Sequence, residues 1–359
     1  MVKICIIFIL LLSLGFIHAE DSLLICLFWN RSVNSIVIFP IADTLIVNGN
    51  AITTSDTLKF TTGENFFAQS NGEFAISDGT TERMVKGIAF GSVGGKVFAK
   101  IALDDWVLLT LLGEFPETNS IEALCAGAIV LRSFALAGKH HSDCDLCDRT
   151  HCALIPEPQP IPQKFIEAVD RTKDLVLTYD DRIISATFSA NCGGQTISAE
   201  IVWGNQCEWS VAVHDTFCNP EHWQFSTDKA ILDTIFPLPV DEWIIFGDSI
   251  AFVGHFDNLN DRFRSVPFPE PVEGSLSNGK IAKFALWDTL FNIFGWGTLK
   301  SPGFALSIDG DSVIFTGVGF GHRVGLCQNG AAQMAKKGKT FEEILQFYFP
   351  KAIIQRRER

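Results

Sequence analysis

The sequence predicts an α+β fold in which strands and helices are intermixed and do not follow a regular β-α-β order. Three observations indicate this fold class. Short apolar or alternating runs, separated by turn residues, fill residues 22–106 and are typical of a β-rich region. An almost wholly apolar helical pattern follows at residues 121–138. Strand and helix signals then alternate irregularly to the C-terminus.

The N-terminal segment has the pattern of a secretory signal peptide. Lys3 supplies a positive charge, residues 4–17 are apolar, and Ala19 offers a small residue at a cleavage point. The apolar stretch is shorter than the roughly 20 residues that span a bilayer, and an uncleaved anchor is the alternative. We therefore expect an exported protein with a signal peptide at residues 1–19 and no transmembrane span in the mature chain.

The β-rich region contains several runs that are apolar or alternate between apolar and polar residues. Pairs such as Asn-Gly, Asp-Gly and Gly-Gly separate these runs, as expected for turns between neighbouring strands. The predicted strands lie at residues 35–41, 44–49, 59–63, 73–77 and 96–103.

The middle of the chain begins with a helix at residues 121–138, which has apolar residues on every face and should be buried. A loop rich in cysteine and histidine follows at residues 140–152. A proline-rich connection and a short helix at residues 164–172 come next.

The C-terminal half returns to strands at residues 174–190, with a hairpin turn at Asp180-Asp181. A second strand pair turns at Asp309-Gly310. The remaining predicted elements are helices at residues 229–235, 281–294, 329–337 and 341–347, and further strands up to residue 253.

The charge balance excludes one class of partner. The chain has 28 Lys and Arg against 41 Asp and Glu, a formal net charge of −13. Binding to nucleic acid requires clustered basic residues that neutralise phosphates, so we expect no nucleic-acid partner. The basic residues 355–359 are interpreted as a solvated tail.

The cysteine count constrains the exported chain. Removal of Cys5 with the signal peptide leaves nine of the ten cysteines, an odd number that disulfides alone cannot use. In an oxidising compartment, Cys192, Cys207 and Cys218 are candidates for structural bridges.

Three stretches carry a resemblance to a known family. Residues 122–135, EALCAGAIVLRSFA, resemble a helix motif E-A-L-K-A-Q-A-x-A-x-R-[ST]-Y-A. Residues 177–204 contain SANCGGQT, similar to S-x-x-G-G-x-T. Residues 319–350 begin GFGHRVGLCQNGA and resemble G-x-G-H-G-x-G-x-x-Q-x-G-A, ending in a similar I-L-x-x-Y-[FY]-P. Together they cover roughly residues 100–354 and resemble the SpoIID/LytB family.

This resemblance implies an organisation and a location. The fold is expected to be a two-lobed SpoIID-like domain with a central cleft, in the periplasm or cell envelope. The β-rich N-terminal region would occupy residues 20–110, the SpoIID/LytB-like catalytic region residues 111–354, and the basic tail residues 355–359.

The resemblance also implies a reaction. In SpoIID proteins, the glutamate that opens the long helix is the catalytic residue of a lytic transglycosylase, and Glu122 matches this position. The resemblance therefore implies cleavage of the β-1,4 link between N-acetylmuramic acid and N-acetylglucosamine in peptidoglycan. One glutamate first protonates the leaving oxygen and then acts as base while the sugar's own 6-hydroxyl attacks, which gives a 1,6-anhydro product. Burial at the start of an apolar helix is a way to raise the pKa of such an acid.

The residues around Glu122 also allow a structural interpretation. Asn119 and Glu122 have the spacing of a capping box, with Asn119 as N-cap and Glu122 at the third helical position. Glu114, in Gly-Glu-Phe-Pro, is the second candidate for a carboxylate at the site, and we assign it to substrate binding.

A metal site is predicted in the Cys/His loop, where some family members bind zinc in a similar segment. The expected ligands are His141, Cys147, His151 and Cys152, a set of thiolates and imidazoles that suits tetrahedral zinc. Its expected role is structural. The alternative is a disulfide among Cys144, Cys147 and Cys152, with surface histidines.

Three further residues are assigned to substrate binding: Ser189, His322 and Gln328. Glycines on both sides of His322 allow a ligand to approach the backbone closely.

Several positions depart from the family pattern, and they bear on activity. Cys125 and Gly127 replace Lys and Gln, Phe188 stands where Tyr is common, and Arg323 replaces a glycine. The departures give weight to a rival, a non-catalytic enhancer that binds glycan strands and stimulates a partner cell-wall amidase. A weaker third candidate is an exported scaffold that recruits envelope enzymes.

Overall fold

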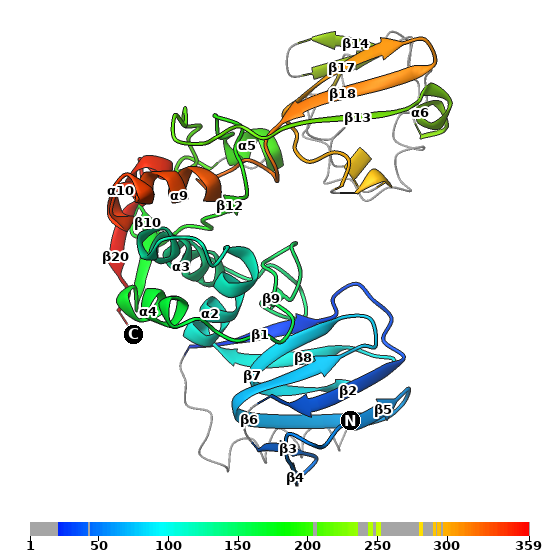
Figure 1. Ribbon diagram of the computed structural model, residues 1–359, viewed down its shortest axis with the longest axis vertical. Coiled ribbons are helices and arrows are strands. Elements are labelled where there is room, and N and C mark those ends of the chain that lie inside the picture. The colour runs from blue at the N-terminus through cyan, green and yellow to red at the C-terminus, as the bar shows by residue number, and fades with distance from the viewer. Residues whose placement is uncertain are drawn as a thin grey trace. The chain divides into compact units, whose positions relative to one another are not determined.

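The computed structural model confirms the α+β class, with helices and strands intermixed (Figure 1). It describes residues 21–41, 44–203, 207–235, 243–246, 249–252, 280–282, 290–291, 293–295 and 297–358. The predicted signal peptide and most of the helix predicted at residues 281–294 lie outside the described residues. Within the described part of the chain, no helix has the length and apolar character needed to cross a membrane.

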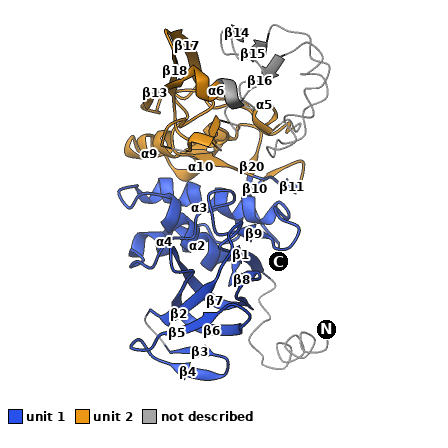
Figure 2. Ribbon diagram, turned by 90° about the vertical axis from the view of Figure 1, so that its right-hand side faces the viewer, with its two compact units in different colours: residues 1–177, 182–185, 354–359 blue, residues 178–181, 186–353 orange. Residues whose placement is uncertain are grey.

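The chain divides into two compact units, coloured in Figure 2. Unit 1 comprises residues 1–177, 182–185 and 354–359, and unit 2 comprises residues 178–181 and 186–353. The expected domain boundary at residue 110 falls inside unit 1, and the domain organisation expected from the sequence stays a prediction.

Unit 1 contains an extended, mostly antiparallel sheet in the order β4-β3-β6-β7-β8-β1-β9, with β2 pairing with β5 and β6. The strands are β1 (Ser22–Leu27), β2 (Ser35–Pro40), β3 (Leu45–Val47), β4 (Asn50–Ile52), β5 (Leu58–Thr61), β6 (Asn65–Ser77), β7 (Glu82–Ser92), β8 (Val97–Ala102) and β9 (Leu146–Cys147). Alternation of buried and partly buried residues in β2 and β8 shows that one face of the sheet packs on the core. The β-rich prediction is thus confirmed up to residue 102.

The strand pattern predicted to residue 106 is wrong at its end, because Leu103 starts helix α2 (Leu103–Glu114). An apolar run such as this one cannot be assigned to strand or helix by periodicity alone. Leucine-rich composition and two acidic residues in the first turn, Asp104 and Asp105, favour the helix.

Helix α3 (Ile121–Leu136) confirms the predicted buried helix, and α4 (Gln163–Arg171) confirms the short helix after the proline-rich connection. The helices α2, α3 and α4 pack against one another, next to β1 and β9 (Figure 1). Arg132, on α3, is completely buried and donates to Asp104 on α2 at 3.0 Å and to the Thr172 carbonyl after α4 at 2.8 Å. One guanidinium therefore ties the three helices together.

Unit 2 is built largely from loops and small sheets. Its helices are α5 (Ala199–Trp203), α6 (Lys229–Ile235), α9 (Gln328–Lys336) and α10 (Phe341–Tyr348). Its strands include β12 (Phe188–Ser189), β13 (His222–Asp228), β14 (Trp243–Phe246), β15 (Ser249–Phe252), β16 (Lys280–Ala282), β17 (Phe304–Asp309), β18 (Ser312–Val318) and β19 (Leu326–Cys327). The strands β10 (Leu175–Tyr179), β11 (Arg182–Ile183) and β20 (Ile353–Arg356) form a further sheet in the order β11-β10-β20.

Both predicted hairpin turns are confirmed. Asp180 and Asp181, between β10 and β11, have φ values of 48° and 59°, which aspartate tolerates better than most residues. Gly310, between β17 and β18, has a φ of 56°. The start of the helix predicted at residues 281–294 is wrong: residues 280–282 form β16 and pair with β15.

Candidate functional site

Glu122 lies in the first turn of α3 and does not cap it. The helix begins at Ile121 with Ser120 as its N-cap, and the cap side chain makes no hydrogen bond within the described residues. The capping-box interpretation with Asn119 as N-cap is therefore wrong, because the helix starts one residue later than that motif requires. The carboxylate Oε1 of Glu122 instead accepts a hydrogen bond from Nη2 of Arg171, on α4, at 2.8 Å.

The ion pair leaves Glu122 accessible. Its side chain is 24% exposed and that of Arg171 is 39% exposed. A partly exposed pair of this kind contributes little to stability and can rearrange when a ligand binds. Arg171 was not among the site residues predicted from the sequence, since the two residues are far apart in the chain.

Glu114, the last residue of α2, is in a different environment. Its Oε1 accepts a hydrogen bond from the backbone N–H of Leu154 at 2.6 Å. Burial raises the pKa of the Glu114 carboxyl above its ordinary value, and the Leu154 hydrogen bond offsets part of this increase. The loop that carries Leu154 approaches the end of α2 closely because residue 113 is a glycine. A Cβ at this position would lie 2.3 Å from the Leu154 carbonyl oxygen. Burial therefore biases the Glu114 carboxyl toward its protonated form.

The four predicted zinc ligands come together in the loop around β9. The ligand atoms of His141, Cys147, His151 and Cys152 all lie within 4.8 Å of one another. Cys152 Sγ is 3.2 Å from His141 Nε2 and 3.4 Å from His151 Nδ1, and Cys147 Sγ is 3.9 Å from His151 Nδ1. Zn–N and Zn–S bonds of about 2.0–2.3 Å in a tetrahedron require separations of roughly 3.3–3.8 Å between ligand atoms. The donor set and its spacing therefore fit zinc.

The disulfide alternative is wrong in its pairing. Cys144 forms a disulfide with Cys26 on β1, 118 residues away, and Cys147 and Cys152 are free thiols. Because β9 pairs with β1 in parallel, Cys147 lies opposite Cys26, and the disulfide attaches the loop to the edge of the sheet. Cys192, Cys207 and Cys218, which were candidates for structural bridges, are also free thiols in the structure.

Aromatic and charged side chains support the Cys/His cluster. The Trp29 ring packs on both imidazoles, with ring centroids 4.8 Å from His141 and 4.7 Å from His151. Asp148, completely buried beside Cys147, accepts a hydrogen bond from Arg83 Nε at 2.8 Å. These contacts restrict the orientation of the ligands in the way that outer-shell groups do around metals.

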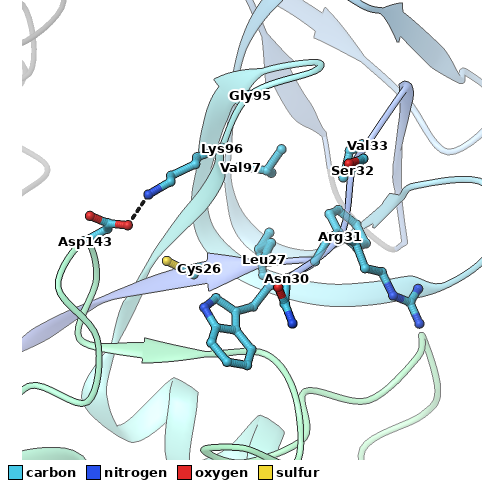
Figure 3. Close-up of a pocket in the computed structure, with 12 residues that line it drawn as sticks. Cys26, Leu27, Asn30, Arg31, Ser32, Val33, Gly95, Lys96, Val97 and Asp143 are labelled. Carbon is cyan, nitrogen blue, oxygen red and sulfur yellow. Dashed lines mark hydrogen bonds and ion pairs between the residues drawn. The ribbon is translucent and has the colours of Figure 1, made fainter. Parts of the chain in front are cut away.

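A pocket of about 400 Å³ opens beside Cys26, along the end of β1 (Figure 3). Lys96 and Asp143 form an ion pair at one side of it, and Arg31 lies at the other (Figure 3). Among the described residues that line it, none is a predicted catalytic or metal-binding residue.

The remaining predicted site residues belong to unit 2 and lie close to one another. Strand β12 pairs in parallel with β19, which places Ser189 opposite Cys327, and Gln328 starts α9 directly afterwards. The Ser189 side chain is buried, and its hydroxyl makes no hydrogen bond within the described residues. Trp203, on α5, is 39% exposed and packs against His322 with ring centroids 5.1 Å apart.

His322 has a structural function in its loop. Its Nδ1 accepts a hydrogen bond from the Val324 N–H at 3.0 Å. Burial lowers the pKa of His322 to about 4, against a smaller increase from a hydrogen bond with the Phe188 backbone. The imidazole is therefore neutral at pH 7 and holds the turn that leads into β19.

Comparison with known proteins places these features in a family. The SpoIID family model, described as a stage II sporulation protein, matches residues 93–179. This segment contains Glu114, Glu122 and the whole Cys/His cluster.

Several characterised and uncharacterised relatives extend the match. The chain is 27% identical over 263 residues to an uncharacterized protein of Brachyspira hyodysenteriae. The alignment covers 70% of this chain and 66% of the relative. It is 24% identical over 274 residues to the amidase enhancer of Bacillus subtilis, 66% of this chain and 38% of that protein. It is 25% identical over 267 residues to stage II sporulation protein D of Bacillus subtilis, 69% and 73% of the two chains. The family model and the named relatives support the assignment of the chain to the SpoIID/LytB family.

Proposed function

We propose that this chain is an exported lytic transglycosylase of peptidoglycan, cleaving the β-1,4 link between N-acetylmuramic acid and N-acetylglucosamine to leave a 1,6-anhydro product. The observation that carries the proposal is the partly buried carboxyl of Glu114, which accepts a hydrogen bond from the Leu154 N–H at the end of α2, within the segment that matches the family model. A leaving glycosidic oxygen must be protonated, so the reaction needs a carboxyl group that keeps its proton near neutral pH.

Two carboxyl groups share the proposed chemistry. The environment of Glu114 supports it as the proton donor more strongly than that of Glu122, whose carboxylate is held by Arg171. Glu122, the residue expected from the family motif, remains the alternative donor if a bound sugar displaces Arg171. In either case, the same carboxylate then removes the proton of the sugar's 6-hydroxyl as this oxygen attacks the anomeric carbon, so one residue serves both steps.

The Cys/His cluster would hold zinc through His141, Cys147, His151 and Cys152. With four protein ligands the ion has no open position, and its contribution is to hold the loop after β9 in place. The reaction is assigned to carboxyl groups alone.

Unit 2, taken by itself, carries three groups suited to binding sugar. The buried Ser189 hydroxyl, the exposed ring of Trp203 and the side chain of Gln328 are the groups proposed for this role. An exposed indole offers a flat apolar face with a polar N–H, which suits one face of a pyranose ring.

The first experiment is mass spectrometry of products released from intact and amidase-stripped glycan strands. We expect 1,6-anhydro-muramyl products with the wild type. Glu114→Gln should lower the rate by about 10²–10⁴-fold, the usual effect of removing a general acid. Glu117→Gln is the matched control, because Glu117 is exposed in the loop that follows α2.

The variants Glu114→Gln, Glu117→Gln and Glu122→Gln distinguish the two candidate proton donors. Loss of product with Glu122→Gln but not with Glu114→Gln would return the donor role to Glu122. Binding of strands by the wild type with no released product under either condition would reject catalysis.

The second candidate is an enhancer of a cell-wall amidase, favoured by the name of the Bacillus subtilis relative. This function predicts that the chain raises the rate of a purified amidase on sacculi, and that Glu114→Gln and Glu122→Gln enhance as well as the wild type does. Enhancement that disappears with Glu114→Gln would instead tie the effect to glycan cleavage.

A further inference from the structure

Unit 2 contains a second cluster of metal-ligand side chains, separate from the predicted zinc site. Its members are Cys192, Asp215, Cys218 and Cys327, and their ligand atoms all lie within 4.8 Å of one another. They are at most 6% exposed. The sequence analysis did not group them, because they come from three segments that are far apart in the chain.

The backbone around the cluster is held in place by hydrogen bonds. Asp215 N–H donates to the Gly194 carbonyl at 2.9 Å, which attaches the Asp215 loop to the loop that carries Cys192. Asp215 Oδ1 accepts from the N–H groups of Phe217 and Cys218, each at 3.0 Å. The loops are therefore fixed by contacts that do not use the sulfur atoms.

Backbone N–H groups point at the sulfurs. Cys327 Sγ accepts from the N–H of Cys192 at 3.2 Å and from that of Gly330 at 3.3 Å. Cys218 receives hydrogen bonds from the backbone of Gly193 and Gly194, which both have positive φ. Without a metal, the Cys192 and Cys218 thiols face oxygen acceptors, Asp215 Oδ2 and Asn191 Oδ1, each at 3.3 Å. Successive N–H groups near the sulfurs can also stabilise thiolates, the form that binds a metal ion.

An outer contact orients the carboxylate. Asp215 Oδ2 accepts a hydrogen bond from the buried Tyr348 hydroxyl at 2.7 Å and lies 3.3 Å from Cys192 Sγ. Gly330 allows this approach, since a Cβ there would lie 2.3 Å from Asp215 Oδ2 and 2.0 Å from the Tyr348 hydroxyl. A ligating carboxylate in a protein commonly has such a second hydrogen-bond partner.

A bound cation would neutralise the cluster. Three thiolates and a carboxylate together in a buried site would cost far too much free energy without a cation, so the thiols would ionise only as the ion binds. A disulfide would use two of the three cysteines and leave the third beside a buried carboxylate. A single tetrahedral divalent ion uses all four groups, with ligand atoms about 3.8 Å apart for Zn–S bonds near 2.3 Å.

We propose that Cys192, Asp215, Cys218 and Cys327 bind a second structural metal ion of the zinc class. Binding releases the thiol protons to solvent and leaves three thiolates and one carboxylate on the ion. The ion joins the loop after β12 to the start of α9. It thereby fixes the backbone on which Ser189 and Gln328 are carried.

The test is the metal content of the full-length chain, purified with zinc and measured by native mass spectrometry and elemental analysis. The double variant Cys147→Ser/Cys152→Ser removes the first cluster, and we expect it to retain one equivalent of metal. Adding Asp215→Asn and Cys218→Ser should remove that equivalent. Metal content unchanged by the added substitutions overturns the proposal, whatever the first cluster binds.

A second measurement covers the case in which the quadruple variant does not fold. Cobalt(II) added to the Cys147→Ser/Cys152→Ser variant should give the sulfur-to-cobalt charge-transfer and visible bands of a tetrahedral site with three thiolates. Absence of these bands overturns the proposal. A metal-free chain with a disulfide within the group also overturns it; such a chain loses two hydrogens in the intact mass beyond the two lost through the Cys26–Cys144 disulfide.

Discussion

Among single residues, Arg323 shows why a departure from the family motif is tolerated. It takes a φ of 65°, where the family has glycine, so the substitution places backbone strain in the turn. Its buried side chain donates to the Cys192 carbonyl at 2.7 Å and to the Gln195 carbonyl at 2.9 Å. Charge-assisted hydrogen bonds of this kind contribute about 1.5–3 kcal/mol each, which outweighs the strain.

His322 gives a prediction for the pH dependence of stability. Because its pKa falls from 6.5 in the unfolded chain to about 4 in the folded protein, its contribution is complete above pH 6.5 and is lost as the pH falls through 4. The wild type should lose about 3 kcal/mol of unfolding free energy from this group between pH 7 and pH 4. His322→Asn keeps an acceptor for the Val324 N–H and should remove this loss. Urea unfolding of the wild type and of His322→Asn at pH 7 and pH 4 measures the loss of unfolding free energy in each protein. Equal losses in the two proteins would contradict the prediction.

At the scale of helices and strands, Gly127 and Cys125 are explained by packing. A Cβ at Gly127 would lie 2.6 Å from the Phe115 ring and 2.9 Å from Leu111 Cδ1, both buried. Cys125 is also buried, and its Sγ lies 3.8 Å from the Ala168 carbonyl oxygen on α4. These two departures from the family pattern adjust the contacts between helices and do not remove a group from the proposed chemistry.

Gly127→Ala should therefore destabilise the protein although alanine is the better helix former. Overpacking a dense core costs about 1–3 kcal/mol, against a gain of roughly 1 kcal/mol from helix propensity. We expect a net loss of about 1 kcal/mol in urea unfolding. Gly297→Ala is the control, since a Cβ there meets no described atom within 4 Å. A stabilised Gly127→Ala protein would show that α3 can move away from Phe115.

What the sequence predicts well is local. The strands of the β-rich region, the buried helix α3 and both hairpin turns follow from patterns within a few residues. The ligands His141, Cys147, His151 and Cys152 could be grouped because they lie within twelve residues. Helix α2 was missed because an apolar run has no distinctive period. Partners far apart in the chain, such as Arg171 for Glu122 or Cys26 for Cys144, have no local signal.

For the whole molecule, the Cys26–Cys144 disulfide should be a main source of stability. It closes a loop across most of unit 1, and such cross-links typically contribute about 2–4 kcal/mol. The variant Cys26→Ser/Cys144→Ser should unfold at a lower urea concentration, and its free energy of unfolding should be lower by about 2–4 kcal/mol. Reductant should destabilise the wild type equally and leave the variant unchanged. A variant as stable as the oxidised wild type would show that β1–β8 and β1–β9 pairing suffices.

The same disulfide constrains the order in which the chain matures. Short loops close faster and at lower entropic cost than long ones, so an oxidant acting on an unfolded chain would join Cys144 to its near neighbour Cys147 before Cys26. The native pairing therefore requires that β1 and β9 meet, or that Cys147 and Cys152 be already engaged, before oxidation occurs. Maturation of this protein therefore depends on the order of events, because one of these two arrangements must exist before the disulfide can form between the native partners.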